Sequence, residues 1–574
     1  MIQNVARQCY LFAKRSPRLR KLIRLPIVAR FKAALATRLA VGDKQYERWL
    51  LEHRARRLAG ITPCTEPSLL SFLTTVWNTP APYLQVLADS LLNQSPDRDF
   101  EWILLDNGTT DPQTRACLQA AVASDPRVKL FRVEDNLGIV GGMRFCLERA
   151  TGRYVLPLDS DDYLYPDATA ILKHWITSHN FPPLLYSDED HLLGRRAVQP
   201  YFKPDWDPVL FLNSAYIAHL CAIDRHRALE LDVYAHADAN GCHDWDTFLK
   251  FMAAGHVPVH ISEMLYSWRM HARSTASNIN SKNYIHQSHQ AVLGRYLARR
   301  PAAARYHLEP SPLFDGTPDW WIRRSHVAPR PILSLVLCEQ PPHSEPTIVA
   351  GDPPLTELKL ARTTPINRVL ELVETWAPQG GLVRLISEEL TVDNSEWPWE
   401  ALALMELHPD VAVVGGPVHD RRGVLVDAGR YLGFGDGCGC PDIGRTVHDR
   451  GYFAQLWKQR SVSAVSTRFC VFDAAFLTDL LRDCGHWKHV SLAWLGAWAG
   501  AFALRTGRRV VYSPFFSAAS NQDWYRDVSP AERAEFLATH HDILPDRRFY
   551  SKHLSLSPDL AYRPAPPAPL SHVA

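Results

Sequence analysis

The chain has 574 residues, a formal net charge of +2 and 46% hydrophobic residues, as expected of a folded protein with more than one domain. This composition excludes a disordered chain, and because no run of about 18 apolar residues occurs, we expect no transmembrane helix. The N-terminus lacks a secretory signal pattern. The eleven cysteines show no disulfide or zinc-binding spacing, and Cys438 and Cys440 form an isolated C-G-C, so we expect reduced thiols in a cytoplasmic protein.

Charge is distributed unevenly along the chain. Residues 1–60 contain 15 Lys or Arg and 3 Asp or Glu, a net +12, which leaves −10 for the rest of a chain of net charge +2. Basic and apolar residues are mixed there, as in surface helices that bind anionic lipid headgroups. We therefore expect a basic helical arm that contacts the inner face of the plasma membrane. The alternatives are a helical hairpin packed on the protein body and nucleic-acid binding, which no aromatic-interleaved motif supports.

Apolar runs alternate with helical patterns through the first half of the chain. The sequence predicts strands at 67–77, 100–111, 128–133 and 153–162, and helices at 81–94, 112–124 and 138–152. This alternation predicts an α/β fold with a mostly parallel, doubly wound sheet and helices on both faces. Ligands bind such sheets at the carboxyl ends of strands, where the polar turns "DNGTTD" and "DSDD" fall.

A similar pattern restarts after a Pro-rich passage. "GGLVRLISEEL" repeats the pattern of "GRYVLPLDSDD", and "LRTGRRVVYSP" repeats that of "MAAGHVPVHIS", which predicts an internal duplication. The predicted organisation is a basic arm at 1–62, a first domain at 63–300, a linker at 301–330, a second domain at 331–550 and a tail at 551–574.

Three aspartates, Asp159, Asp161 and Asp162, fall within four positions directly behind an apolar run. Repulsion among them costs stability unless a cation compensates. The chain has five D-x-D triplets, at 97–99, 159–161, 188–190, 205–207 and 244–246. Strand alternation would point Asp159 and Asp161 to the same side, where Mg²⁺ or Mn²⁺ completed by substrate phosphates would suit them. The alternative is a helix cap or an Asx turn.

Several ordered motifs between about residues 67 and 290 resemble those of family 2 glycosyltransferases, which have the GT-A fold. These motifs are "LLDNGTTD", "NLGI", "ATGRYVLPLDSDD", "YSDEDHL", "YFKPDWDP" and "GCHDWDTFLKFMAAG", and "YERWLLEH" resembles a preface found in enzymes that build bacterial surface polysaccharides. The resemblance implies a Rossmann-like GT-A fold. It also implies metal-dependent, inverting transfer from a nucleotide-diphosphate sugar to a growing polysaccharide or polyprenyl-linked glycan, such as O-antigen or capsule.

The resemblance also implies roles for individual residues. Asp159 and Asp161 would hold the metal with His271, for which simple packing is the alternative, and Asp244 would be the general base. Asp246 would cap its helix or pair with an arginine. The nucleotide-sugar site would contain Thr75, Trp77, Asp106, Asn136, Gly138, Asp159, Asp188, Glu189, Asp190, Trp268 and Arg269. For residues 188–190 the alternative is a solvated acidic loop.

Two departures from the family pattern, Asn107 in place of Asp and Arg144 in place of Asn, put the donor's identity in doubt. The second domain departs further, because Ser387, Glu388 and Glu389 follow its strand. Aligning Gly507 with Gly255 places Gly496 and Trp498 at the positions of the first domain's later D-x-D. We expect a catalytically silent domain that holds the acceptor glycan; the alternative is a second active site using Glu388 and Glu389.

Two other functions compete with glycosyl transfer. A nucleotidyltransferase would need a Gly-rich phosphate loop after its first strand, and "TTVWNTPAPY" supplies none. A non-catalytic glycan-binding or scaffold protein derived from such enzymes would not depend on Asp161.

Overall fold

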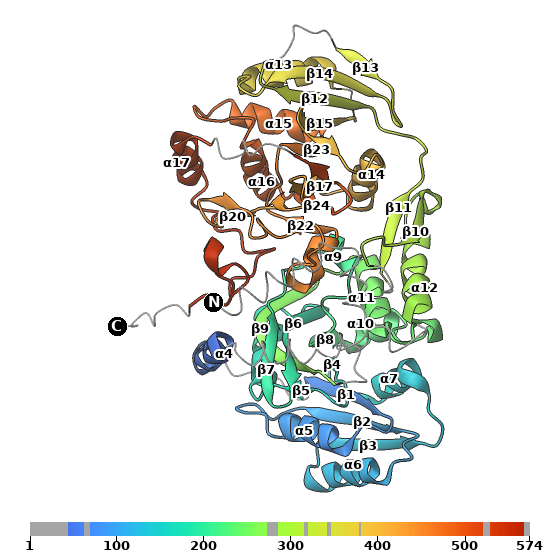
Figure 1. Cartoon of the computed structure of the whole chain (residues 1–574). Coiled ribbons are helices and arrows are strands. Elements are labelled where there is room, and N and C mark those ends of the chain that lie inside the picture. The colour runs from blue at the N-terminus through green and yellow to red at the C-terminus, as the bar shows by residue number, and fades with distance from the viewer. Residues whose placement is uncertain are drawn as a thin grey trace. The chain divides into compact units, whose positions relative to one another are not determined.

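The computed structural model describes residues 44–61, 69–271, 285–314, 319–340, 346–377, 380–520 and 528–566. The chain divides into two compact units (Figure 1). Unit 1 contains Met1–Lys203, Ile217–Ile285 and Pro564–Ala574, and unit 2 contains Pro204–Tyr216 and His286–Arg563. Most of the predicted basic arm and the last residues of the predicted tail lie outside the described residues.

Unit 1 is built on a mixed nine-stranded sheet in the order β3-β2-β1-β4-β8-β6-β9-β5, with β7 paired to β6. Its strands are β1 (Leu70–Val76), β2 (Glu101–Asn107), β3 (Val128–Val133), β4 (Tyr154–Pro157), β5 (Tyr163–Leu164), β6 (Leu184–Leu193), β7 (Arg196–Tyr201), β8 (Cys221–Asp224) and β9 (Val259–Arg269). The strands β3, β2, β1 and β4 run parallel, whereas β8 is antiparallel to both β4 and β6. The predicted mostly parallel α/β sheet is confirmed.

Helices connect these strands in the predicted chain order. They are α4 (Lys44–Arg57), α5 (Ala81–Leu92), α6 (Pro112–Ser124), α7 (Gly138–Arg149), α8 (Ala168–Ser178), α10 (Arg225–Glu230) and α11 (His243–Ala253). Strand order runs outward from β1 to β3 and then returns to β4 on the other side of β1. The direction of winding therefore reverses between β1 and β4, and the carboxyl ends of strands at such a reversal are where ligands bind in doubly wound sheets.

The core of unit 1 follows from the burial of its central strands. β1 and β2 are buried along nearly their whole length, as expected for strands covered on both faces. Phe72, Leu104 and Leu156, from three neighbouring strands, are fully buried in one cluster with the apolar faces of α5 and α8. The polar residues that follow these strands therefore emerge at the edge of a rigid scaffold.

Unit 2 repeats this topology. Its main sheet has the order β13 (Thr347–Val349), β14 (Leu355–Ala361), β12 (Ile332–Cys338), β15 (Leu382–Ser387), β23 (Phe469–Asp473), β17 (Val411–Gly415), β24 (Arg509–Tyr512) and β22 (Arg460–Val462). The strands β14, β12 and β15 are parallel, β23 is antiparallel to β15 and β17, and β17 is parallel to β24. The strands β12, β14, β15, β17, β23 and β24 thus match β1, β2, β4, β6, β8 and β9 in chain order, position and direction. The predicted internal repeat agrees with this match.

The bounds of all the described strands and helices of unit 2 are as follows. Its strands are β10 (Tyr306–Pro310), β11 (Trp320–Arg324), β12 (Ile332–Cys338), β13 (Thr347–Val349), β14 (Leu355–Ala361), β15 (Leu382–Ser387), β16 (Thr391–Val392), β17 (Val411–Gly415), β18 (Val418–His419), β19 (Leu425–Asp427), β20 (Tyr431–Leu432), β21 (Cys438–Gly439), β22 (Arg460–Val462), β23 (Phe469–Asp473), β24 (Arg509–Tyr512) and β25 (Ala518–Ala519). Its helices are α9 (Pro208–Phe211), α12 (Ile285–Ala298), α13 (Ile366–Trp376), α14 (Trp397–Leu407), α15 (Ala474–Cys484), α16 (Leu495–Arg505) and α17 (Pro530–Thr539). The Pro-rich span 301–330 contains β10 and β11, which pair antiparallel.

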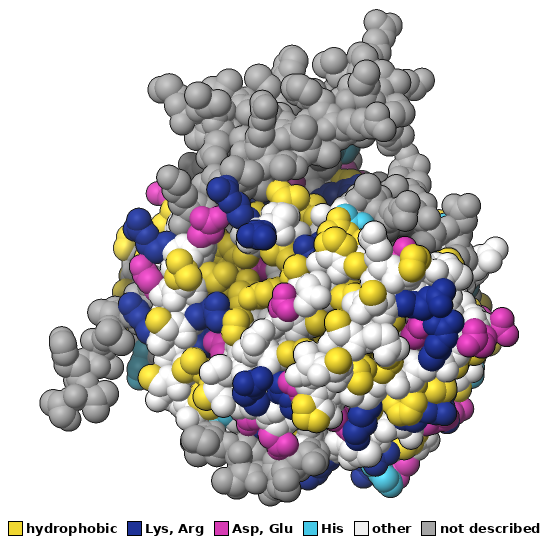
Figure 2. Space-filling view, turned by 90° about the horizontal axis from the view of Figure 1, so that it is seen from below, with side chains coloured by type: hydrophobic (Ala, Val, Ile, Leu, Met, Phe, Trp, Pro, Cys, Tyr) yellow, Lys and Arg dark blue, Asp and Glu magenta, His cyan; other side chains and the backbone are white. Residues whose placement is uncertain are grey.

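Three further observations bear on the sequence predictions. The nine cysteines among the described residues are free thiols. In the same residues, no helix combines the length and the apolarity that crossing a bilayer requires. The face seen in Figure 2 carries basic and acidic side chains interspersed with hydrophobic ones, so the described part of that face shows no continuous field of one sign.

Candidate active site

The predicted acidic cluster lies in a turn just beyond β4. The strand ends at Pro157, and the backbone N–H of Asp162 donates to the carbonyl of Asp159 over 3.4 Å. Strand alternation therefore does not set the directions of Asp159 and Asp161, contrary to expectation, because aspartate favours turns and the strand stops before them. The turn leaves the Asp159 side chain 48% exposed and Asp161 27% exposed, and it buries Asp162 completely.

Asp162 anchors this turn to β9. Its carboxylate accepts hydrogen bonds from the Tyr266 hydroxyl at 2.6 Å and from the backbone N–H of Arg269 at 2.7 Å. Burial, together with the negative charges of Asp161 and Asp159, raises the pKa of Asp162 well above its usual value. The innermost aspartate is thus a structural member of the cluster, whereas the outer two keep partly exposed carboxylates.

Asp161 meets His271 at the outer side of the turn. The distance between the Asp161 carboxylate and His271 Nε2 is 2.7 Å, and both side chains are partly exposed. Burial and the charge of Asp159 raise the pKa of Asp161, and the contact with His271 offsets part of that rise. Arg269 donates from Nε to the Asp161 carbonyl and lies over the Tyr83 ring at 4.8 Å, and that ring also lies 5.4 Å from His271.

These donors suit a divalent cation. One carboxylate oxygen and one imidazole nitrogen already lie at hydrogen-bond distance, and a second carboxylate, Asp159, follows the same strand. Burial and then the charge of Asp159 raise the pKa of Asp161, and a cation bound to both carboxylates would remove the repulsion between them. Carboxylate and imidazole ligands, completed by substrate phosphate oxygens, would suit Mg²⁺ or, with the histidine, Mn²⁺.

His219, which the sequence did not single out, joins the site from β8. Because β8 is antiparallel to β4, the residues just before it lie at the edge where β4 ends. His219 Nε2 lies 3.7 Å from Asp159 Oδ2, and Nδ1 lies 3.6 Å from Glu189 Oε2. Burial alone would lower the pKa of His219, but the two carboxylates outweigh it and raise the pKa well above its usual value. No local pattern in "SAYIAHLCAID" marks this histidine.

Glu189 shares this face with the aromatic side chains of β9. In the parallel pair of β6 and β9, Glu189 is paired with Tyr266, and His191, two residues later, is paired with Trp268. All four side chains therefore lie on one face of the two strands. Trp268 is half-buried, with its ring 5.2 Å from that of His219. Burial alone would raise the pKa of Glu189, but the Lys203 ammonium and His219 lower it to about 2. Glu189 therefore stays charged at the mouth of the sheet.

Asp188 and Asp190 are engaged within the fold and form no solvated loop. Asp188 is fully buried and accepts hydrogen bonds at 2.8 Å from the backbone N–H of Lys203 and from His260. Burial raises the pKa of Asp190 to about 7, although hydrogen bonds to its charged form partly offset that rise. These bonds come from three hydroxyl groups, those of Tyr46, Tyr165 and Ser267. The triplet thus presents Glu189, and neither aspartate, on the face that carries His219.

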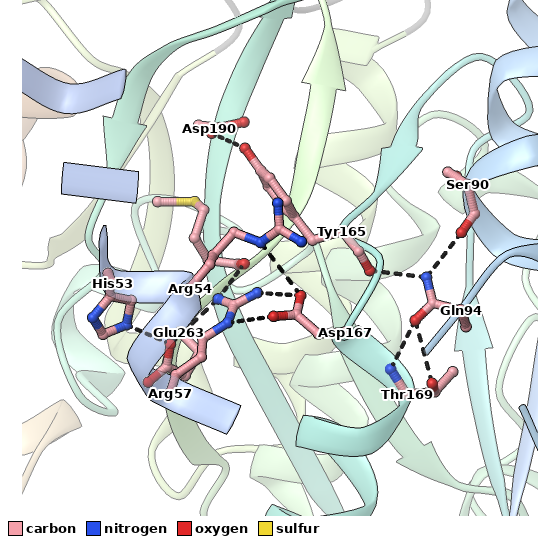
Figure 3. Close-up of polar contacts among 11 residues, drawn as sticks. His53, Arg54, Arg57, Ser90, Gln94, Tyr165, Asp167, Thr169, Asp190 and Glu263 are labelled. Atoms are coloured by element: carbon pink, nitrogen blue, oxygen red, sulfur yellow. Dashed lines mark hydrogen bonds and ion pairs between the residues drawn. The ribbon is translucent and has the colours of Figure 1, made fainter. Parts of the chain in front are cut away.

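The helix α4 secures the opposite face of β6 and β9 (Figure 3). Arg57 makes a two-pronged contact with Asp167 at the start of α8 and also donates to the Met264 carbonyl at 2.9 Å. His53 lies 2.7 Å from Glu263, which Arg57 also contacts. The segment similar to the family's preface is therefore docked on unit 1, directly behind the strands that carry the site.

Asp106, predicted to contact the nucleotide base, ends β2 with its carboxylate already engaged. Arg132 of β3 donates to Oδ2 at 2.6 Å, and the backbone N–H of Thr109 donates to Oδ1 at 2.9 Å. Asp106 is buried, whereas the Arg132 side chain is 37% exposed. Thr75 is half-buried in β1 and Trp77, just beyond it, is 59% exposed, so these predicted residues lie with Asp106 at the ends of β1 and β2.

The departure at Asn107 has a structural reason. Its amide nitrogen donates to the Asn136 side chain and to the Gly138 carbonyl, both at 3.1 Å, while its oxygen accepts from the Leu137 N–H at 2.9 Å. A carboxylate could only accept, so an aspartate would lose the two donated bonds. Asn107 thus fixes the loop that starts α7, which carries the predicted Asn136 and Gly138.

Arg144, the second departure, faces away from that loop. It pairs with Glu148 at 2.6 Å and with Asp232 at 2.9 Å. Neither contact involves a predicted site residue, and Arg144 links α7 to the chain beyond α10.

Asp244 lies in the first turn of α11 and is half-buried, and its carboxylate accepts from the Trp245 N–H at 2.8 Å. Burial and then the Asp244 charge raise the pKa of the Cys221 thiol, which places Asp244 near the start of β8. Asp246 instead is buried and pairs with Lys250 at 2.9 Å, one turn along the same helix. Of the two carboxylates, only Asp244 keeps partial exposure at the edge where β4 ends.

Strand register gives the residues of unit 2 that stand where these site residues stand in unit 1. Leu70 pairs with Tyr154 and Ile332 with Leu382, while Asp224 pairs with Tyr154 and Asp473 with Leu382. Counting from these pairs, five positions correspond. Asp106 matches Ala361, Asn107 matches Arg362, Asp159 matches Ser387, Asp161 matches Glu389, and His219 matches Arg468.

The carboxylate of unit 2 is neutralised by the protein itself. Glu389 pairs with Arg362 at 2.6 Å and with Arg468 at 3.2 Å, and all three side chains are largely buried. The turn that carries Glu389 has the same geometry as in unit 1, because the Leu390 N–H donates to the Ser387 carbonyl. Two guanidinium groups thus contact the acidic turn of unit 2 from the positions that Asn107 and His219 occupy in unit 1.

The base position of unit 2 is closed to any side chain. Gly496 aligns with Asp244, and a Cβ at Gly496 would lie 2.1 Å from the Val465 carbonyl oxygen. Trp498, which aligns with Asp246, is fully buried. The helix α16 therefore packs directly on the backbone that precedes β23.

Comparison with known proteins gives the class of the first unit. Residues 71–190 match the model of glycosyl transferase family 2, so unit 1 carries a domain of that family with the GT-A fold expected from its motifs and topology. An uncharacterized protein of Sinorhizobium fredii is 27% identical over 69% of this chain and 47% of its own length. The O-antigen biosynthesis protein RfbC of Myxococcus xanthus is 25% identical over 65% of this chain and 31% of its own length.

The chain therefore spans half or less of the length of these relatives. Among solved structures, residues 1–349 of Staphylococcus aureus TarS in complex with UDP-GlcNAc align with a TM-score of 0.35 and 19% identity. That alignment covers 40% of this chain and 67% of the other.

Proposed function

We propose that unit 1 transfers a sugar, with inversion, from a nucleotide-diphosphate sugar to a growing polysaccharide or a polyprenyl-linked glycan of the cell surface. The observation that carries this proposal is the Asp161–His271 contact of 2.7 Å at the topological switch point of a family 2 glycosyltransferase domain. A nucleotide diphosphate needs charge neutralisation at this point, and the outer aspartates need a cation.

Asp161, Asp159 and His271 would hold Mg²⁺ or Mn²⁺, which would neutralise the departing diphosphate. Asp244 would accept the proton of the acceptor hydroxyl, since it is the half-buried carboxylate at the start of α11. The base and ribose would lie beyond β1 and β2, with Trp77 beside them and Asp106 held by Arg132. Trp268 and Glu189 would face the donor sugar or the acceptor, whereas Asp188, Asp190 and Arg269 would act from within the fold.

The acceptor assignment has separate support. The relative from Myxococcus xanthus is named for O-antigen biosynthesis, and residues 1–60 carry a net charge of +12. We propose that this arm binds the anionic inner face of the plasma membrane, where a polyprenyl-linked acceptor would lie. Deleting residues 1–40, which leaves α4 intact, should move the protein to the supernatant on membrane fractionation while transfer to a soluble acceptor continues. Unchanged fractionation would contradict the membrane role.

Unit 2 would be a silent copy that supports or binds the acceptor glycan. Its support is the closed position at Gly496 and the internal pairing of Glu389. An enzyme of this kind needs one open metal site and one base, and unit 2 offers neither among its described residues.

The decisive experiment is calorimetric titration of UDP, dTDP and GDP into the full chain with and without Mn²⁺, repeated on Asp161→Ala. We expect one nucleotide to bind in a metal-dependent manner and Asp161→Ala to abolish that binding. Absence of binding by every nucleotide to a folded protein would favour the non-catalytic scaffold instead.

A further inference from the structure

Two carboxylates of unit 1 that arise from distant parts of the sequence are linked by one imidazole. Asp159 follows β4 and Glu189 lies within β6, and the ring of His219 stands between them with one nitrogen facing each. Both contacts, at 3.7 and 3.6 Å, are within ion-pair distance. The two ring nitrogens therefore reach two different acidic groups at once.

The ring of His219 is held from behind by stacking. It lies 5.2 Å from the Tyr266 ring at an interplanar angle of 18°, and 5.2 Å from the Trp268 ring at 30°. Tyr266 is itself fixed, because its hydroxyl donates to Asp162. The backbone carbonyl of His219 accepts from the buried Lys203 ammonium, which also contacts Glu189 at 3.3 Å. The imidazole thus sits on a rigid platform, which lowers the entropy cost of the contacts it makes.

Asp159 is the outer carboxylate that His219 contacts. Its side chain is 48% exposed and follows the end of a strand, and its Oδ2 lies 3.7 Å from His219 Nε2. Groups that orient a metal ligand from behind typically change metal affinity by about 10–100-fold when removed.

We propose that His219 is a positioning residue that holds the Asp159 carboxylate toward the cation position next to Asp161 and couples it to Glu189. This inference rests on the proposed function of the same site. The equivalent position in unit 2 gives independent support, since Arg468 occupies it and contacts Glu389, the counterpart of Asp161. In both units the residue at this register position contacts a carboxylate of the acidic turn or of its neighbouring strand through a side-chain nitrogen.

The two nitrogens can be separated by substitution. An asparagine places its amide nitrogen where Nδ1 stands, one bond from Cγ, whereas a glutamine places it near Nε2. His219→Gln therefore keeps the contact with Asp159, His219→Asn keeps the contact with Glu189, and His219→Ala removes both. His179→Ala is the matched control, because His179 stacks on Trp175 at 4.7 Å on α8, away from the acidic turn.

The test is titration of MnCl₂ into the full chain, followed by the electron paramagnetic resonance signal of free Mn²⁺, with UDP, dTDP or GDP present in turn. We expect His219→Ala and His219→Asn to weaken Mn²⁺ binding by about 10-fold or more, His219→Gln to remain within about 3-fold of wild type, and His179→Ala to be unchanged. Circular dichroism melts check folding. If His219→Ala fails to fold, the Gln and Asn variants still separate the outcomes.

Different failures have different meanings. Wild-type Mn²⁺ binding that Asp161→Ala abolishes but no His219 variant changes would overturn the positioning role alone, as would a loss of thermal stability without loss of Mn²⁺ affinity. Equal weakening by Gln and Asn would show that Asp159 is not the group His219 serves. Failure of the wild-type chain to bind Mn²⁺ with any nucleotide would overturn the proposed function.

Discussion

Units 1 and 2 share one sheet topology but treat the turn after the fourth strand of that topology in opposite ways. In unit 1 the turn carries Asp159 and Asp161, which repel each other and contact His219 and His271. In unit 2 it carries Ser387 and Glu389, and Glu389 is clamped by two arginines. One turn keeps a charge that a ligand could satisfy, whereas the other satisfies its charge internally.

The difference shows how one sheet topology can carry two turns of opposite electrostatic character. Arg362 and Arg468 supply fixed positive charge where unit 1 has Asn107 and His219, so the acidic turn of unit 2 needs no cation. Gly496 then allows α16 to approach the backbone at Val465. These changes favour a stable scaffold, and unit 1 keeps the electrostatic strain that active sites commonly retain.

The first prediction tests which unit is active. Asp161→Ala should lower the rate of sugar transfer by about 10³-fold, because the developing diphosphate charge loses its cation. Glu389→Gln, at the matching position of unit 2, should leave the rate unchanged. The measurement is transfer of radiolabelled sugar to membrane acceptor at saturating donor. A loss of transfer with Glu389→Gln would reverse the roles assigned to the two units and revive the alternative of a second active site.

The second prediction concerns the base. Asp244→Asn should lower kcat by about 10²–10⁴-fold, because the amide cannot accept the acceptor's proton, while nucleotide binding stays the same. Calorimetry and single-turnover transfer separate the two effects. If Asp244→Asn instead weakens nucleotide binding and leaves turnover of bound donor intact, Asp244 contacts the donor and the base lies elsewhere.

The elements on which this comparison depends could be predicted from sequence because they are local. The helix at 112–124 and the strand at 128–133 match their predicted bounds, since a proline and an aspartate mark the helix start and an alternating apolar run marks the strand. Alignment of Gly507 with Gly255 also placed Gly496 opposite Asp244, and the sheet register gives the same alignment, because Val259 and Val511 pair with equivalent residues.

The long-range partners could not be predicted. His219 reaches Asp159 only through the antiparallel pairing of β8 with β4, a contact across 60 sequence positions that no local pattern encodes. The role of Asp190 was also hidden, because its hydroxyl donors come from α4, β9 and the chain after β5. The sequence pattern identified the acidic groups. Only the fold shows which carboxylates face the candidate site and which are buried and hydrogen-bonded within the protein.

The third prediction compares the stability of the two turns. Glu389→Ala should destabilise unit 2 by about 3–5 kcal/mol, because two largely buried guanidinium groups lose their carboxylate. Asp161→Ala should leave metal-free unit 1 unchanged or more stable by about 1 kcal/mol, since it removes repulsion with Asp159. Amide hydrogen exchange of the full chain measures the stability of each unit separately, from the peptides that belong to that unit. Equal destabilisation by both variants would mean that the acidic turn of unit 1 is also satisfied internally.

The fourth prediction, with the smallest effect, contrasts the pH response of the units. Burial raises the pKa of Asp190 in unit 1 to about 7, whereas burial, with the charges of Arg509 and Arg300, lowers the pKa of His408 in unit 2 to about 3. Because the pKa of Asp190 is higher in the folded state than in the unfolded state, the folded state holds the proton more tightly. Unit 1 should therefore lose stability as pH rises from about 4 to 7. A lowered imidazole pKa favours the neutral fold, so unit 2 should lose stability as pH falls from about 6.5 toward 3.

Each pH effect is a slope of at most about 1.4 kcal/mol per pH unit, and it should vanish with one substitution. Hydrogen exchange of the β6 and α14 peptides, corrected for the intrinsic pH dependence of exchange, should show opposite slopes between pH 4 and 7. Asp190→Asn should flatten only the β6 slope and His408→Gln only the α14 slope. Parallel slopes in the wild-type chain would show that other groups control both units. In that case the electrostatic difference between unit 1 and unit 2 would be confined to their acidic turns.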